Sequence, residues 1–240
     1  MAKRKVSLIG GLVLVGLGAA VVLGVQKILK ENGQTCIDCH KGIAHFLPEE
    51  KNDNNGSAEL AKHGGQLSGE NKLLYALTIS TAKSTNGGEV RLMPFAELAD
   101  WKSDGENVAA TLHGWQQVGA ESVLYTELGQ RITMAILDDD AKAGVLVKNK
   151  VHDSVTDSEW LEVFLDVNVP KSAVTSDLNS LNVFGKNLNE THCGGCHAPI
   201  TAEHYTANQW IGMVNSMKDR TSLTKDQVRA LTIYLQRNAK

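Results

Sequence analysis

The chain has 240 residues and a mass of 25.9 kDa, which is enough for one or two small domains in addition to an anchor. Its 24 basic and 27 acidic residues leave a net charge of −3, so composition gives no reason to expect a nucleic-acid partner. Hydrophobic residues make up 42% of the chain and charged residues 21%, and this balance excludes a wholly disordered protein.

The first segment has the pattern of a membrane anchor. A basic tip with Lys3, Arg4 and Lys5 precedes a run from Val6 to Gln26 that contains no charged residue. As a helix this run spans about 31 Å, the thickness of the hydrocarbon core of a bilayer. A cleavable signal peptide is the alternative, but its apolar region is typically about 7–15 residues long. We therefore predict that residues 1–27 form a cytoplasmic tip and a single inner-membrane helix, with the remainder in the periplasm.

All four cysteines lie in two copies of the pattern Cys-x-x-Cys-His, at residues 36–40 and 193–197. In this pattern two thiols attach covalently to haem and the following histidine binds its iron. A zinc site would need the two pairs to meet across more than 150 residues, and a redox dithiol or a disulfide would not explain the two histidines. The sequence thus predicts two covalently bound haem c groups, with these residues as attachment points and proximal ligands: Cys36, Cys39, His40, Cys193, Cys196 and His197.

The first motif falls in a membrane-proximal segment, residues 28–50, which a polar linker at 51–69 follows. Residues 70–172 are rich in short apolar runs typical of strands, at 73–79, 145–147 and 160–167. We expect a β-rich spacer or docking domain over these residues. Stretches that begin with a tryptophan near residues 101 and 160 suggest an internal repeat, which two small barrels would explain. His113 and His152 are isolated there, and no catalytic or metal-binding group is apparent.

Residues 173–240 read as an all-α cytochrome c-like haem domain. Apolar residues recur at helical spacing before Cys193 and again on either side of residue 210. Thr224 with Gln227 forms a capping-box pattern that begins a last helix, which has Val228, Leu231, Tyr234 and Leu235 on one face. Met217 is the first candidate for the distal iron ligand, with Met213 and His204 as alternatives, since a thioether is a known axial ligand. Both methionines could instead only fill the core. The fold class expected overall is mixed: a transmembrane helix, a β-rich middle and an α-helical end.

Two sets of residues resemble a known family. Residues 36–45, with the sequence CIDCHKGIAH, resemble the last haem motif of the tetrahaem quinol dehydrogenases of the NapC/NirT type. Residues 114–117, 129–132, 193–210 and 234–236 resemble the C-terminal part of pentahaem TorC-type cytochromes, which serve trimethylamine-N-oxide reductase. Such cytochromes carry four haem motifs before the last one, whereas this chain has one. The resemblance implies that His45, which matches the family histidine after the last motif, ligates a haem of that cluster. His45 and His63 are both candidates for the distal ligand of the first haem.

The resemblance implies an electron carrier, not an enzyme. Electrons would come from the quinol pool or a membrane tetrahaem donor and leave for a periplasmic molybdenum-type reductase in anaerobic respiration. With Met217 as a ligand, the second haem should have the higher potential. Two other functions are weighed against this one: a dihaem peroxidase-like enzyme, which would need an open iron position, and a haem-loading sensor that acts on a membrane kinase.

Overall fold

We describe a computed structural model of the chain for residues 54–65, 67 and 73–240. The chain divides into a unit of residues 1–52 and a unit of residues 53–240, and all described residues belong to the second. Within the described residues, no helix is both long and apolar enough to cross a membrane. The predicted anchor and the first haem motif lie outside the described residues. A helix, α3 (Asn54–Ala61), lies within the stretch that we expected to be a linker.

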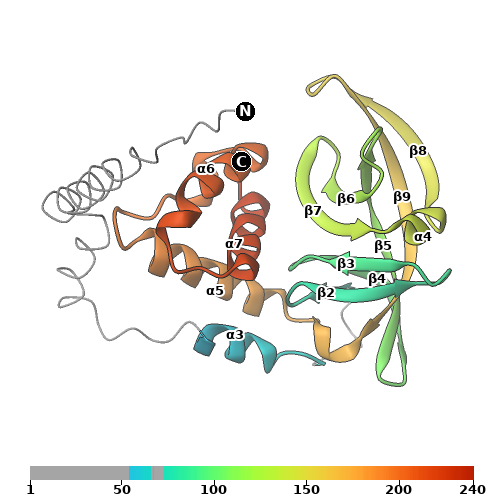
Figure 1. Ribbon diagram of the computed structural model, residues 1–240, viewed down its shortest axis with the longest axis horizontal. Helices are drawn as coiled ribbons and strands as arrows, with labels where there is room; N and C mark the ends of the chain where they lie inside the picture. Colours follow the sequence, from blue (N-terminus) through green and yellow to red (C-terminus); the bar gives the residue numbers. More distant parts are fainter. Residues whose placement is uncertain (1–53, 66, 68–72) are drawn as a thin grey trace, which may run out of the picture. The chain divides into compact units, whose positions relative to one another are not determined.

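Ten strands form a single antiparallel sheet (Figure 1). Its order is β10-β1-β4-β5-β6-β7-β3-β2-β9-β8. An additional pairing of β5 with β9 closes part of the sheet into one barrel, which consists of β5, β6, β7, β3, β2 and β9. The strands are β1 (Leu73–Ala76), β2 (Ser80–Ser84), β3 (Glu89–Leu92), β4 (Glu97–Asp104), β5 (Asn107–Gln117), β6 (Val123–Glu127), β7 (Gln130–Leu137), β8 (Leu146–Asp153), β9 (Ser158–Pro170) and β10 (Val174–Thr175). A short helix, α4 (Asp139–Ala143), joins β7 to β8.

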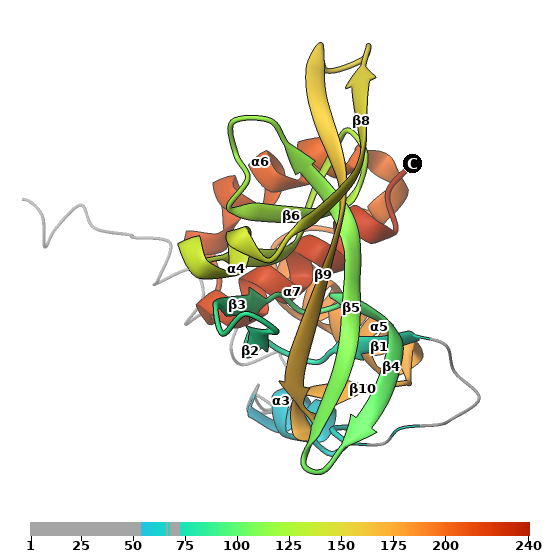
Figure 2. The same ribbon diagram turned by 90° about the vertical axis from the view of Figure 1, so that its right-hand side faces the viewer.

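The pairing of β5 with β9 is the longest in the sheet and extends from Asn107 opposite Pro170 to Gln117 opposite Trp160 (Figure 2). Every second residue of β5 is buried from Val108 to Gln116, as expected of a strand with one face toward a core. Cross-strand pairs such as Leu112 with Leu165 share that inward face. The inward faces of these two strands form a large part of the sheet core, and β1, β3 and β7 contribute further buried residues.

The expectation of two small barrels is wrong, because all ten strands belong to one sheet with one closure. The three predicted strand regions do contain β1, part of β8 and most of β9. Alternation of apolar residues identifies a strand, but it does not show which strand lies beside it. The two stretches that suggested a repeat, near residues 101 and 160, thus belong to two strands, β4 and β9, of the same sheet.

Three helices follow the sheet: α5 (Leu178–Leu188), α6 (Ala207–Met217) and α7 (Lys225–Arg237), with short helical turns η1 (Lys171–Ala173), η2 (Asn189–Cys193), η3 (Ala202–His204) and η4 (Lys218–Arg220) between the elements. Asp177 caps α5 by accepting hydrogen bonds from the Asn179 and Ser180 amides. The predicted capping box at the start of α7 is confirmed: Thr224 and Gln227 each bond the other's backbone N–H, at 3.2 and 2.8 Å.

The prediction of a separate all-α haem domain is wrong, because the helices share a core with the sheet. In this shared core, Leu181, Ala207 and Ile233 of the helices pack with sheet-side residues that include Leu77, Met93, Phe95 and Ile132. Burial of Leu181 and Ile233 contributes about 1.5–3 kcal/mol each. The apolar stripe of each helix was visible in the sequence, but part of its packing surface belongs to residues more than 40 positions away.

Polar contacts fix how the helices lie on the sheet. The Asn208 side chain of α6 accepts from the Arg131 backbone N–H at 2.7 Å and donates to the Gly129 carbonyl at 2.9 Å. Buried Gln236 of α7 donates to the Arg131 and Ala207 carbonyls, at 3.2 and 3.0 Å. Segments 129–132, 206–210 and 234–236, which carried the family resemblance, thus meet at one helix–sheet contact.

Candidate functional site

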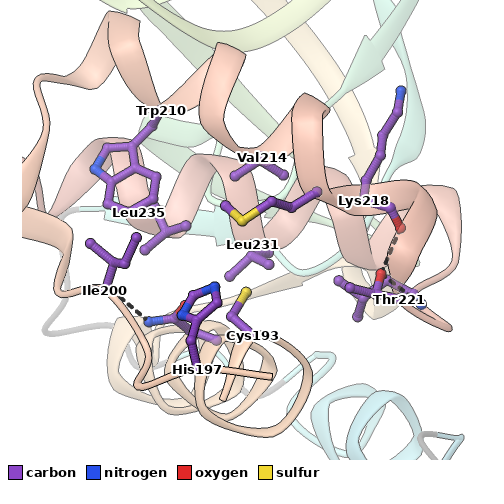
Figure 3. A pocket seen from close by; sticks show the side chains of 12 residues that line it. Cys193, His197, Ile200, Trp210, Val214, Lys218, Thr221, Leu231 and Leu235 are labelled. Atoms are coloured by element: carbon purple, nitrogen blue, oxygen red, sulfur yellow. Dashed lines mark hydrogen bonds between the residues drawn. The ribbon is translucent and has the colours of Figure 1, made fainter. Parts of the chain in front are cut away.

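A pocket opens among the three C-terminal helices and encloses about 390 Å³ of empty space, part of it open to solvent (Figure 3). Its walls are mainly apolar and combine one cysteine, one histidine and one methionine. The lining residues are Asn189, Cys193, His197, Ile200, Trp210, Val214, Met217, Lys218, Thr221, Leu223, Leu231 and Leu235.

The Cys-x-x-Cys-His segment begins where α5 ends. The chain leaves α5 through a single turn of π-helix, η2, and continues as a tight turn over residues 194–196. A Cβ atom at Gly194 would lie 2.2 Å from the Glu190 carbonyl oxygen, so the turn needs glycine there. Cys193 and His197 lie next to each other on one side of the pocket in Figure 3, whereas the Cys196 side chain is exposed.

The hydrogen bond of His197 leaves one ring nitrogen available to a metal. Its Nδ1 lies 2.8 Å from the Ala198 carbonyl oxygen, and a carbonyl can only accept, so Nδ1 carries the proton. The lone pair of the imidazole is then on Nε2. A ring held by one nitrogen and open at the other is the arrangement found in histidines that bind metals.

The opposite wall of the pocket comes from α6 and α7. Val214, Leu231 and Leu235 face Cys193 and His197 across the cavity in Figure 3. Trp210 completes this wall, and its indole N–H is satisfied by the Ala202 carbonyl at 2.7 Å. An apolar wall of this kind excludes water and favours a large, mainly apolar ligand.

Of the three candidates for the distal ligand, only Met217 lines the pocket. Met213, one turn earlier on α6, is half-buried in the helical core but is not part of the lining. His204 is exposed, and its ring packs against Tyr205 with 4.7 Å between the centroids. In the described part of the chain, no group of three or more His, Cys, Asp or Glu side chains lies close enough to hold a metal ion.

The residues predicted at and near the first motif, Cys36, Cys39, His40 and His45, lie outside the described residues. His63 follows α3, and its buried Nδ1 lies 3.6 Å from an oxygen of Asp177. The two histidines of the sheet pair with carboxylates, each at 3.0 Å: His113 with Glu162 and His152 with Glu159.

Sequence reasoning did not identify Asn189, Ile200 or Thr221 as part of the site. The Asn189 side chain donates to the Ile200 carbonyl at 3.2 Å and ties the residues after the motif back to the end of α5. Thr221 donates to the Lys218 carbonyl at 2.8 Å and shapes the turn after Met217. Neither hydrogen bond follows from a periodic pattern of residue types, so there was no reason in the sequence to select these residues. The predicted apolar helix faces did include Trp210, Leu231 and Leu235, but as core residues and not as residues of a pocket.

The two thiols of the motif should differ in reactivity before any group is attached to them. Burial raises the pKa of the Cys193 thiol above its usual value, which lowers its thiolate fraction at neutral pH. In the apoprotein we expect iodoacetamide to alkylate exposed Cys196 first and Cys193 more slowly. The alkylation rate of Cys193 should still rise with pH at values where the rate of an unperturbed thiol no longer increases. Peptide mass mapping over time and pH measures both rates. Equal rates at the two positions would contradict this prediction.

Comparison with known proteins places the chain in context. Residues 70–174 match the TorC third cytochrome c domain, and residues 19–50 match the N-terminal region of the NapC/NirT cytochrome c family. The chain is 61% identical over 209 residues to the cytochrome c-type protein TorY of Haemophilus influenzae, an alignment that covers 87% of this chain and 56% of that protein.

More distant relatives give the same result. The chain is 34% identical over 212 residues to TorY of Escherichia coli O157:H7, covering 88% of this chain and 56% of the relative. It is 31% identical over 218 residues to the cytochrome c-type protein TorC of Escherichia coli K12, covering 89% and 55%. The chain thus spans little more than half the length of the curated relatives that it matches. No solved structure matches it.

Proposed function

We propose that this chain, which matches the TorC third cytochrome c domain and is similar to the TorY and TorC c-type cytochromes, is a membrane-anchored dihaem electron carrier. It takes electrons from the quinol pool or from a membrane tetrahaem donor and passes them to a periplasmic, molybdenum-type trimethylamine-N-oxide reductase in anaerobic respiration. The observation that carries this proposal is the pocket in which Cys193, His197 and Met217 meet among apolar walls.

The residues of this pocket fit a covalently bound haem c, which supplies a reversible one-electron couple when it is attached. Cys193 and Cys196 provide the two thioether sulfurs, and His197 offers Nε2 while the Ala198 carbonyl holds its other nitrogen. Met217 would offer its thioether sulfur to the iron of such a group. Val214, Leu231 and Leu235 would keep water away from it, which favours electron transfer over ligand exchange with solvent.

The remaining parts of the chain have separate proposed roles. Residues 1–27 anchor the protein in the inner membrane, and residues 28–50 hold the first haem c through Cys36, Cys39 and His40. His45 or His63 supplies its distal ligand. The sheet of residues 73–175 and the helices packed on it then lie in the periplasm, where they place the C-terminal haem within reach of a soluble partner.

The carrier role is tested with the full chain in proteoliposomes. Reduction of the haem absorbance by a menaquinol analogue, alone and with a tetrahaem donor, identifies the source of electrons. Addition of trimethylamine-N-oxide reductase and its substrate should then reoxidise both haems. The double variant Cys193→Ala/Cys196→Ala keeps the first motif, so its remaining haem should be reduced but not reoxidised at the wild-type rate. A wild-type protein that the reductase never reoxidises would contradict the proposal.

A further inference from the structure

A series of three aromatic rings connects the pocket with the protein surface. The Trp210 ring lines the pocket and is only 2% exposed. Tyr205 packs edge-on against Trp210, with 5.1 Å between ring centroids and 88° between ring planes. His204 packs edge-on against Tyr205 in the same way, at 4.7 Å and 85°, and is exposed. Ring contacts therefore run without a break from solvent to the pocket wall.

Local backbone structure holds the three rings in place. The Trp210 indole N–H donates to the Ala202 carbonyl at 2.7 Å, which ties α6 to the turn η3. The His204 amide donates to the Thr201 carbonyl at 3.1 Å within that turn. The Thr206–Gln209 capping box then fixes the point where the chain enters α6. All three rings thus come from one segment of seven residues, 204–210, and their order does not depend on distant contacts.

Packing energy alone explains the contact of Tyr205 with Trp210 better than the contact of His204 with Tyr205. Edge-to-face aromatic pairs contribute about 0.5–1.5 kcal/mol, which accounts for Tyr205 against buried Trp210. An exposed imidazole at the end of the series buries little surface. Its position instead makes it the point at which a docked protein would touch the ring series.

We propose that His204, Tyr205 and Trp210 form the electron route between the C-terminal haem pocket and a partner, whose one-electron metal centre docks over His204. This inference rests on the proposed function. One electron leaves the reduced site, passes the three rings by electronic coupling, and reduces the metal centre of the partner by one unit. The rings are not themselves oxidised, no bond is made or broken, and no proton moves. Tyr205 is then a positioning residue, because its ring bridges the other two.

The route can be tested without knowledge of the partner. A ruthenium polypyridyl complex is attached to His204 of the full-length haem-loaded protein, and singly labelled species are separated and assigned by peptide mapping. Flash-quench oxidation generates Ru(III), which then withdraws one electron from the reduced site. We expect transfer from the site to Ru(III) on His204. A protein labelled instead at His152, which is exposed on β8, should show slower transfer.

Two variants separate the route from simple packing. Tyr205→Leu removes the bridging ring and should slow transfer to the His204 label several-fold, while Tyr205→Phe keeps the ring and should retain the wild-type rate. Both are compared at matched reduction potential and with an unchanged haem spectrum. Equal rates in Tyr205→Leu and wild type would overturn the route and leave the carrier function intact. Absence of haem at Cys193 and Cys196 would instead overturn the proposed function.

Discussion

Replacement of Met217 by alanine should lower the reduction potential of the C-terminal haem by an amount on the order of 100 mV, since axial ligands set haem potentials over a range of about 0.8 V. Met217 is the one candidate distal ligand that lines the pocket, and a thioether ligand raises the potential. Loss of the ligand should also convert the oxidised C-terminal haem from low spin to high spin. A redox titration followed by absorbance measures both effects.

Two further variants make the Met217 experiment decisive. Met217→His should restore a low-spin, six-coordinate haem but not the high potential, because the strong imidazole ligand replaces the thioether. Met213→Ala is the matched control, because Met213 is on the same helix and packs on the helical core but does not line the pocket. If Met213→Ala shifted the potential and Met217→Ala did not, the ligand assignment would be wrong. The assignment also requires the C-terminal haem to have a higher reduction potential than the membrane-proximal haem.

The largest effect on stability is expected from Gly185→Ala. Gly185 is buried in α5 where this helix crosses α7, and a Cβ atom there would lie 2.3 Å from Cγ of Tyr234. Ring and helix must move apart to admit a methyl group, and overpacking of this kind typically costs about 1–3 kcal/mol. The free energy of unfolding should fall accordingly, as measured by denaturant unfolding of variant and wild type in the same haem state.

Gly212→Ala is the matched control for this prediction. Gly212 is also in a helix, α6, but it is exposed and an added Cβ atom would meet nothing within 4 Å. Alanine gains up to about 1 kcal/mol over glycine in a helix, so this variant should be as stable as wild type or more stable. Because both substitutions share that gain, their difference isolates the clash with Tyr234. Equal stability of the two variants would show that the helix crossing tolerates a side chain.

Local patterns predicted the parts of this protein that depend on neighbours in sequence. The Cys-x-x-Cys-His segment 193–197, the capping box at Thr224 and the apolar face of α7 each need only a few adjacent residues to be identified. The candidate ligand Met217 followed from the same kind of reasoning and lies in the pocket with His197. Such signals are strong because the chemistry of attachment or capping requires fixed residue types at fixed spacing.

The sequence did not predict what packs against what. Asn208 bonds backbone groups of residues 129 and 131, and Gln236 reaches Arg131 across 105 positions of sequence. The closure of the barrel depends on β5 meeting β9, which likewise is not encoded in either strand alone. The spacing of apolar residues on a helix is the same whether that face packs against another helix or against a sheet. For this reason the C-terminal helices looked like a separate domain, although they share a core with Leu77, Phe95 and Ile132.

Intact-mass and peptide mass spectrometry of the mature protein tests the basis of this account most directly. The peptide that spans residues 193–197 should carry the mass of one haem bonded through both Cys193 and Cys196, and the absorption of a c-type cytochrome should travel with it. Detection of this peptide with two free thiols, or joined only as a disulfide, in protein from cells that assemble c-type cytochromes would contradict the assignment of the pocket.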